Sequence, residues 1–294
     1  MPHICSSMSD PPKPSYLSLP IPHFLDVFRL VEEVMRANDT PFYLLGLPAA
    51  ELQLLQEEYY IEPFSSRKKW KDMDFAMRVP SLEVCERIKD QLVSKGFIEV
   101  KKPFGLRHPT YMVATELVPF GEIETGGAED AVIEKISAKA LGLREALEQS
   151  TLELLDDKLV AEVPALHGIA MLALLSWSDN PKTRGMDLRL FDRIVGNYFP
   201  VETDTVLARY DEALREPLDD FIANAAEVIG MRIAELVHKS PVLKKRLLRL
   251  VHKNNHLSKQ GLAWALHRRI GFDLRYAVRI VKRLRRGMLF TPEE

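Results

Sequence analysis

Apolar residues in the first half of the chain switch between helical and strand spacing, which predicts a sheet covered by helices. Residues 23–37 carry apolar side chains three and four positions apart, as one face of an amphipathic helix does. Residues 42–46 form a short apolar run typical of a buried strand, and Pro48 stands where a following helix, 49–58, would begin. Apolar and polar positions alternate strictly in residues 72–79, which predicts a half-buried strand.

Further elements of both kinds follow this strand. Pro80 and Ser81 precede a helical repeat, and Gly96 is placed to end it. Residues 97–100 and 111–118 then have the composition of two more strands. The first half of the chain is therefore expected to be a mixed α/β (α+β) domain.

From Pro164 onward the apolar pattern is almost entirely helical. Helices are expected near residues 164–177, 187–198, 204–214, 218–238, 242–253, 258–269 and 273–286. The N-terminus is rich in Pro and Ser, which predicts a disordered leader, with Met8 as a candidate true start. The chain thus divides into a leader at 1–22, an α/β domain at 23–162 and a mostly helical domain at 163–294.

The composition is that of an ordinary soluble globular protein, with 294 residues of which 46% are hydrophobic and 28% charged. The two cysteines, Cys5 and Cys85, have no paired spacing, so neither a disulfide framework nor a thiolate zinc site is expected. The longest strongly apolar run, residues 169–177, is much shorter than the roughly 20 residues that cross a bilayer. We therefore expect a cytoplasmic protein with no membrane span.

Positive charge is concentrated near the C-terminus, although the net charge is only -2. Between Arg232 and Arg286 there are 16 Lys and Arg against two acids, which gives +14 and leaves -16 for the other residues. So few acids leave the cations nearly unpaired, which predicts binding to a polyanion, RNA or DNA. A solvated helical face is the alternative. The candidate RNA contacts are Lys244, Lys245, Arg246, Arg249, Arg268, Arg269, Lys282 and Arg283.

The strongest chemical signal is a pair of carboxylates, Asp72 and Asp74, on one face of the strand expected at 72–79. Side chains two apart on a strand lie within about 7 Å of each other. Like charges so close repel, and a divalent cation between them removes that repulsion, as in enzymes where carboxylates and substrate phosphates hold magnesium. An isolated Asp-x-Asp is more often a solvated strand face, so the neighbouring residues decide.

Three neighbouring features favour metal and phosphate binding. Basic residues, including Arg67 and Lys68, precede the strand, where they could counter a triphosphate. Glu116 lies among apolar side chains on a later strand, a position that is costly unless a cation or an open strand end accompanies it. Gly46 ends an apolar strand just before a helix, where a tight turn lets backbone N–H groups approach phosphate.

Residues 42–46, 71–79 and 116–124 resemble, in order and spacing, the successive blocks of the AbiEii-type nucleotidyltransferases of the polymerase-beta-like superfamily. A helical block at 168–177 followed by Asp179, Arg184, Asp187 and Tyr198 resembles the helical half of that family. These enzymes transfer a nucleoside monophosphate from an NTP to an acceptor, and several are toxins that act on the acceptor ends of tRNA.

The resemblance implies a nucleotidyltransferase-like fold for residues 23–162 and a role for each matching residue. Asp72, Asp74 and Glu116 would be the catalytic carboxylates that hold two Mg²⁺ ions. Gly46 would stand in the phosphate-binding turn. The remaining candidate nucleotide contacts are Arg67, Lys68, Lys182, Arg184 and Asp187.

The chain departs from the family pattern where phosphate is held. Leu47 replaces a second Gly or Ser, Glu116 replaces an Asp, and Ala173 and Met186 replace lysines. The leading hypothesis is a toxin-like Mg²⁺-dependent nucleotidyltransferase that acts on RNA, with tRNA as the expected acceptor and an antitoxin protein as a candidate partner. A degenerate, non-catalytic module that binds RNA or a protein is the alternative. A small-molecule nucleotidyltransferase would have little use for the C-terminal charge.

Overall fold

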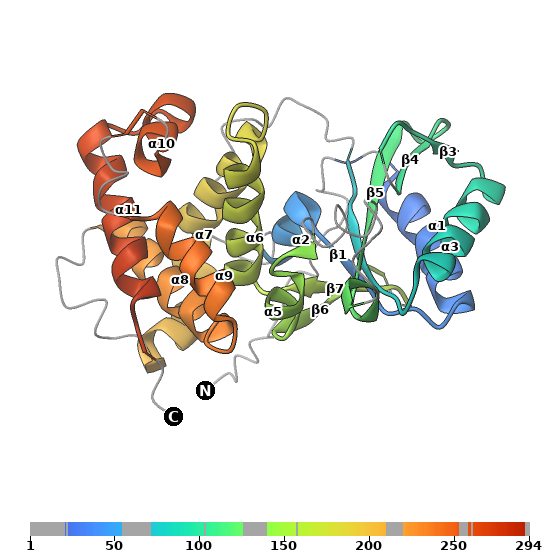
Figure 1. The fold of residues 1–294 in the computed structure, drawn as a ribbon, viewed down its shortest axis with the longest axis horizontal. Coiled ribbons are helices and arrows are strands. Elements are labelled where there is room, and N and C mark those ends of the chain that lie inside the picture. Colours follow the sequence, from blue (N-terminus) through green and yellow to red (C-terminus); the bar gives the residue numbers. More distant parts are fainter. Residues whose placement is uncertain are drawn as a thin grey trace, which may run out of the picture.

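The computed structural model describes the chain in segments: residues 21, 23–54, 72–102, 104–125, 140–156, 158–209, 220–252, 258–259 and 261–291. The leader expected at 1–22, apart from Ile21, lies outside the described residues, as do Arg67 and Lys68. The described part is a mixed α/β structure whose N-terminal half contains a sheet and whose C-terminal half is mostly helical (Figure 1). None of the helices in these segments is both long and apolar enough to cross a membrane.

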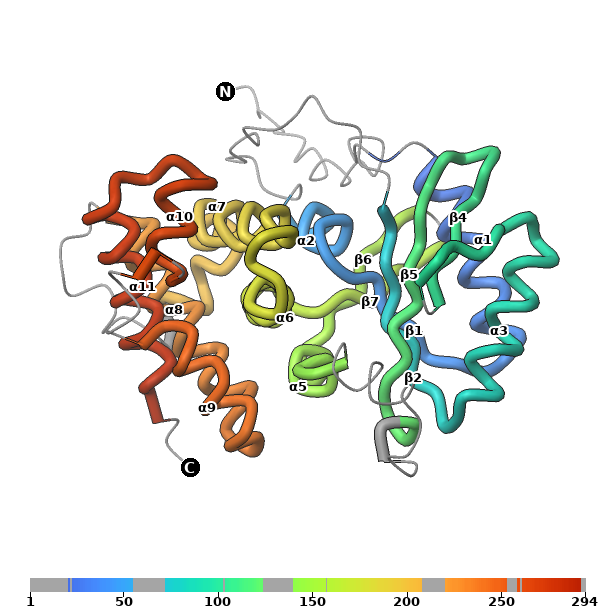
Figure 2. The backbone as a smooth tube through the Cα atoms, turned by 45° about the horizontal axis from the view of Figure 1, so that its top comes forward, coloured from blue at the N-terminus to red at the C-terminus, as the bar shows by residue number. Residues whose placement is uncertain are grey.

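A five-stranded mixed sheet forms the N-terminal half, with the strand order β1-β2-β5-β4-β3. The strands are β1 (Phe42–Leu44), β2 (Phe75–Arg78), β3 (Ile98–Glu99), β4 (Gly105–His108) and β5 (Val113–Phe120). β2 and β5 are parallel, with Phe75 opposite Leu117, and the other neighbours are antiparallel. Helices α1 (Phe24–Ala37) and α3 (Leu82–Ser94) lie on one side of this sheet, and α2 lies on the other (Figure 2).

The alternation predicted for residues 72–79 is confirmed, because its two faces are buried differently. Met73, Phe75 and Met77 are fully buried under α1, where the rings of Phe28 and Phe75 lie 5.8 Å apart between centroids. Regular pairing covers only Phe75–Arg78, and Asp72 takes part in an isolated parallel bridge with Ala114. The strand is therefore shorter than expected, and both aspartates precede it.

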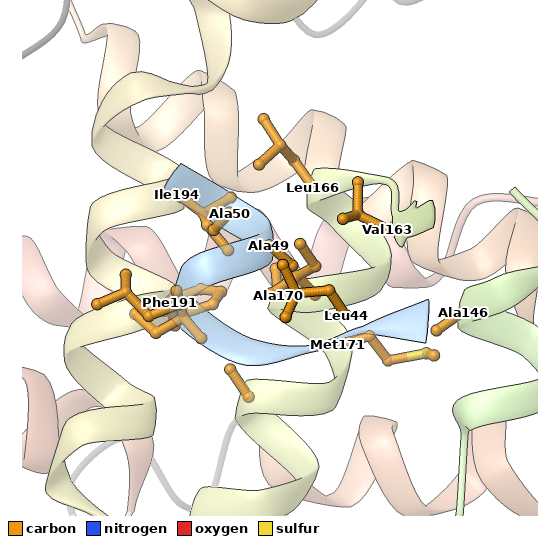
Figure 3. Packing of buried hydrophobic residues seen from close by; sticks show 14 of the residues in the cluster. Leu44, Ala49, Ala50, Ala146, Val163, Leu166, Ala170, Met171, Phe191 and Ile194 are labelled. Carbon is orange, nitrogen blue, oxygen red and sulfur yellow. The ribbon is translucent and has the colours of Figure 1, made fainter. Parts of the chain in front are cut away.

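Helix α2 (Gly46–Leu54) joins the sheet to the helical half. It begins three residues earlier than the helix expected at 49–58, because Gly46 has a φ of +68° and turns the chain directly out of β1. Residues 55–58 lie outside the description. Figure 3 shows the packing at this junction between the apolar residues Leu44, Ala49, Ala50, Ala146, Val163, Leu166, Ala170, Met171, Phe191 and Ile194.

A buried ion pair also fixes α2 against the helical half. Arg193 Nη2 donates to Glu51 Oε2 at 2.6 Å, and less than a tenth of either side chain is exposed. Burial raises the pKa of Glu51, while the hydrogen bond and charge of Arg193 oppose that shift. Removing one partner of such a pair leaves a buried charge without compensation, so the pair constrains where α2 can lie.

The C-terminal half contains most of the helices expected there. A β6–β7 hairpin and the short α5 lead into it, and the elements are α5 (Leu143–Leu147), β6 (Ser150–Leu154), β7 (Val160–Pro164), α6 (Leu166–Asp179), α7 (Gly185–Arg209), α8 (Phe221–Leu236), α9 (Pro241–Leu250), α10 (Leu262–Ile270) and α11 (Leu274–Met288). The helix expected at 187–198 is part of α7, which continues past Pro200 with a kink at Glu202 instead of ending. The domain boundary expected near 162 falls inside β7, and the division into domains stays a prediction.

Helices α8 and α11 approach each other closely because glycines face each other across the contact. A Cβ on Gly287 would collide with the carbonyl oxygen of Glu227, and one on Gly230 would collide with the carbonyl oxygen of Leu284. These obstacles are backbone atoms, which cannot rotate away as a flexible side chain can. The spacing of the two helices therefore depends on the absence of side chains at both positions.

We expect Gly287→Ala to lower the free energy of unfolding by about 1–3 kcal/mol, because the added methyl group must push α8 and α11 apart. The matched control is Gly196→Ala in α7, where a Cβ would meet nothing within 4 Å. That substitution should stabilise the protein by up to about 1 kcal/mol through helix propensity. Urea unfolding of the three proteins measures both effects. Equal stability of the two variants would contradict the close α8–α11 contact.

Candidate functional site

Asp74 and Glu116 lie side by side, and the parallel register of β2 and β5 brings them together. Phe75 pairs with Leu117, so the preceding residues of the two strands are neighbours. The Glu116 N–H donates to Asp74 Oδ1 at 3.0 Å. On the other side of Asp74, its carbonyl accepts the Leu45 N–H at 2.9 Å, and Gly46 follows immediately. The turn at Gly46 and two carboxylates from separate strands thus meet in one place.

The electrostatics of this pair favour a neutral or cation-bound state. The pKa of Asp74 is raised to about 7, first because the carboxyl is buried and then because Glu116 lies beside it. The Glu116 N–H and the charge of Lys102 oppose the shift only in part, and Lys102 Nζ lies 4.0 Å from Glu116 Oε2. At neutral pH the pair therefore holds more negative charge than its surroundings compensate.

Asp72 stands apart from this pair. Its side chain is exposed, and it is absent from the lining of the adjoining pocket, although its charge adds a smaller contribution to the raised pKa of Asp74. Within the described segments, no group of three or more His, Cys, Asp and Glu side chains is arranged to hold a metal ion. The three carboxylates expected to act together are thus found as a close pair and one exposed neighbour.

A pocket of about 180 Å³ opens beside the carboxylate pair. The sheet side contributes Asp74, Glu116 and the turn at Leu45 and Gly46. The helical half contributes polar residues from three helices and the loop before α7: Ser176, Asp179, Arg184, Asp187 and Arg246. Ala173 and several leucines complete the lining. The structure therefore brings Gly46, Arg184 and Asp187 to one pocket with two of the three expected carboxylates.

Each arginine of the pocket has a carboxylate partner. Arg246 on α9 hydrogen-bonds Asp179 at the end of α6. Arg184 Nη1 lies 3.8 Å from Asp187 Oδ2, and Asp187 also accepts a hydrogen bond of 2.7 Å from Ser176 Oγ. Burial raises the pKa of Asp187, against the lowering effects of Ser176 and Arg184. The pocket consequently combines uncompensated negative charge on the sheet side with two paired cations on the helical side.

Lys182 does not line the pocket. It is exposed on the turn between α6 and α7, and its carbonyl oxygen accepts a hydrogen bond of 3.0 Å from Arg269. Arg269 also donates to the Pro181 carbonyl at 2.6 Å, so a residue expected to contact RNA fixes this turn. Gly185 makes the contact possible, because a Cβ there would collide with the Arg269 guanidinium.

The basic C-terminal residues divide into exposed and structural ones. Lys245, Arg249, Arg268, Arg269 and Lys282 are exposed, and Lys244 is half-buried. Arg283 differs from the expectation: it is buried and donates to Glu227 Oε2 at 2.7 Å, so it belongs to the α8–α11 contact. Arg246 lines the pocket.

The expectation that these cations are nearly unpaired is wrong for several of them. Their partners are acids that precede the basic segment or lie at its edge in sequence. Arg279 pairs with Asp220 at 3.0 Å, and Arg286 pairs with Glu227 at 2.9 Å. A count of acids within residues 232–286 could not detect partners contributed by α6 and α8.

The aromatic and histidine side chains considered for base stacking mostly serve packing. The Tyr276 hydroxyl donates to Asp220 Oδ1 at 2.9 Å, and the Trp264 ring packs edge-on against His267. His167, interpreted from the sequence as structural, is buried, and its Nε2 lies 2.9 Å from Gln149 Oε1. His256 lies outside the described residues.

A scan against models of known protein families finds no match for this chain, and no curated protein shows significant similarity to it. The resemblance to nucleotidyltransferases therefore stays a prediction. What the structure contributes is the geometry of the pocket and the state of its charges.

We expect Asp74→Asn to stabilise the protein at pH 8, without divalent cations, by about 1 kcal/mol or more. The folded pKa near 7 lies above the unfolded value, so ionisation penalises folding progressively from about pH 4 to pH 7 and fully above it. Asn keeps an oxygen that can accept the Glu116 N–H. The gain should shrink as the pH falls from 7 towards 4.

Chemical denaturation between pH 4 and pH 8 measures this dependence. Asp90→Asn is the control, because it removes a charge from an exposed position on α3. Equal effects of the two substitutions at every pH would contradict the crowding of charge around Asp74.

Proposed function

We propose that this protein is a magnesium-dependent nucleotidyltransferase that transfers a nucleoside monophosphate from an NTP to an RNA acceptor, with tRNA as the expected acceptor. The observation that supports it best is the pocket itself. A carboxylate pair from two neighbouring strands adjoins the glycine turn on one side, and two arginines line the pocket on the other. This arrangement suits a ligand that carries both phosphate groups and a bound cation. A nucleotidyltransferase-like fold for the sheet-containing half is part of the same proposal.

The residues present fit one Mg²⁺ ion. Mg²⁺ in phosphate-transferring sites is commonly held by one or two carboxylates together with substrate phosphates and water. Asp74 and Glu116 supply such oxygens, and the raised pKa of Asp74 means that a bound cation would relieve their repulsion. Asp72, exposed two residues earlier, would be a ligand of a second ion only together with substrate oxygens. Bound magnesium would neutralise phosphate charge and lower the pKa of the attacking hydroxyl.

The protein's own groups would position the reactants. Glu116, or a water that it holds, would accept the proton of the acceptor hydroxyl. The backbone at Gly46, where α2 begins, would face the phosphates with N–H groups that have no partner within the first helical turn. Sites that enclose a drug-sized ligand have volumes of about 300–1,000 Å³, so a pocket of about 180 Å³ fits the phosphate part of an NTP better than the whole molecule.

The exposed cations would bind the RNA acceptor. Helix α9 carries Arg246 in the pocket and Lys245 and Arg249 on its exposed side, so the basic surface begins where the pocket ends. Phosphate contacts of this kind give affinity without base specificity. Action as a toxin, and a neutralising antitoxin, rest on the family resemblance alone.

A non-catalytic module that binds RNA is the second candidate, and one observation favours it. Ala173 lines the pocket at a position where the resembling family has a lysine, so α6 supplies no amine there. Leu47 is buried in the core beside the glycine turn, and Met186 is exposed. Such a module would keep the basic surface but would have no need to bind NTP and magnesium.

We expect the purified protein to transfer label from an α-phosphate-labelled NTP to total RNA when magnesium is present. Asp74→Asn should lower that transfer at least about a hundredfold, because it removes a carboxylate from the reacting centre. Asp90→Asn should leave it unchanged. Transfer that survives Asp74→Asn would remove the proposed role of the pocket.

Titration calorimetry separates the two candidates. The enzyme should bind NTP with magnesium and lose this binding in Asp74→Asn, whereas the module should bind RNA alone. RNA binding without any NTP binding, together with absent transfer from all four NTPs, would favour the module.

We expect the double charge reversal Lys245→Glu with Arg268→Glu to weaken RNA binding about tenfold or more at moderate salt. Both side chains are exposed, and phosphate contacts account for most of such affinity. The slope of log Kd against log salt should fall by about two contacts. Reversal of two exposed cations of the sheet-containing half, Arg87 and Lys95, is the control. Equal weakening by both pairs would argue against a localised RNA surface.

A further inference from the structure

Arg246 reaches the pocket from a part of the chain that the sequence gives no reason to connect with it. It lies on α9, 67 residues after Asp179, with which it is hydrogen-bonded. The same pocket contains Arg184, Gly46 and the two carboxylates of the sheet. Both guanidinium groups therefore lie beside the place where the phosphates of the proposed substrate would be held.

The ion pairs that hold the two arginines are of a kind that an anion can replace. The side chains of Arg246 and Asp179 are 34% and 54% exposed, and exposed pairs contribute little to stability. The Arg184 side chain is 50% exposed, and its distance of 3.8 Å from Asp187 is longer than a hydrogen bond. A phosphate group carries more charge than one carboxylate and accepts paired hydrogen bonds from a guanidinium.

The backbone around Arg184 is fixed before any ligand arrives. Arg269 on α10 donates to the carbonyls of Pro181 and Lys182, which hold the turn between α6 and α7. Helix α7 begins at Gly185 directly after Arg184, so the positive end of its dipole adds to the field at this wall of the pocket. Little ordering remains to be supplied when an anion binds, and this increases affinity.

We propose that Arg246 and Arg184 form a polyphosphate-binding subsite, in which Asp179 and Asp187 hold the guanidinium groups until phosphate replaces them. The ligand class is a di- or triphosphate group, bound between this arginine pair and the turn at Gly46. Arg246 compensates for the absence of a cation at Ala173 in the same pocket. The subsite deepens the proposed function and rests on it for the identity of the ligand as an NTP.

The two members of the Arg246–Asp179 pair should have opposite effects on anion binding. Calorimetric titration with inorganic tripolyphosphate, in the presence of a chelator, measures the subsite without catalysis. Arg246→Gln should weaken binding about tenfold or more, because charge-assisted hydrogen bonds are lost. Asp179→Asn should strengthen binding severalfold, because Arg246 no longer has a competing carboxylate.

Lys245→Gln is the matched control, since it removes the same charge from the neighbouring exposed position and should leave binding unchanged. Arg184→Gln should weaken binding as Arg246→Gln does. Thermal unfolding of each variant shows whether the fold is retained. If Arg246 only supported the structure, Asp179→Asn would not strengthen binding. That result, unchanged binding in Arg246→Gln, or absent binding by the wild-type protein would overturn the subsite.

The failure of the subsite and the failure of the proposed function can be told apart. Tripolyphosphate binding that depends on Arg246, without nucleotidyl transfer, would support the subsite and count against the enzyme. Transfer that depends on Asp74 but proceeds normally in Arg246→Gln, with tripolyphosphate binding unaffected, would support the enzyme and overturn the subsite.

Discussion

The parallel pairing of β2 with β5 is the constraint on which the site depends. It sets Asp74 beside Glu116, and the hydrogen bond from the Glu116 backbone to the Asp74 side chain keeps the two carboxylates together. Charge repulsion alone would separate them. The buried opposite face of the sheet prevents this, because Met73, Phe75 and Met77 on β2 are locked under α1 by apolar packing. The core of the sheet thus stabilises a pair of groups that would not come together on their own.

Helix α2 turns this local arrangement into a pocket. The left-handed turn at Gly46 sends the chain from β1 into α2, and the Arg193–Glu51 pair and small alanines hold α2 against α6 and α7. The sheet and the helical half therefore form opposite walls at a fixed separation. Cations of the helical half can act on a ligand held by the carboxylates of the sheet only because this separation is maintained.

The sequence predicted local structure well and long-range partners poorly. Alternation in residues 72–79 and the amphipathic pattern of 23–37 follow from burial of one face, so both elements were predictable. β4 and β6 were not, because β4 is four residues long and β6 exposes Leu152 and Leu154. The kinked α7 was divided at Pro200, where a helix more often ends than bends.

The same difference between local and long-range information applies to the site. Asp74, Glu116 and Gly46 could be proposed from their positions at strand ends, and the structure brings them together. The contributions of Arg246 to the pocket and of Arg283 to the α8–α11 contact were not predictable, because they depend on how helices distant in sequence pack. Charge counted along the chain predicted a basic region, but it could not separate side chains that pair with distant acids from those that face solvent.

The most direct test of this account is the location of a divalent cation and a polyphosphate in the pocket. Crystals of the protein grown with Mn²⁺ and a non-hydrolysable NTP analogue would give an anomalous signal for the metal. The account predicts a peak within coordination distance of carboxylate oxygens of both Asp74 and Glu116, with the phosphates beside Arg184 and Arg246. A fully bound analogue whose metal and phosphates lie elsewhere, with these four side chains unchanged, would contradict it.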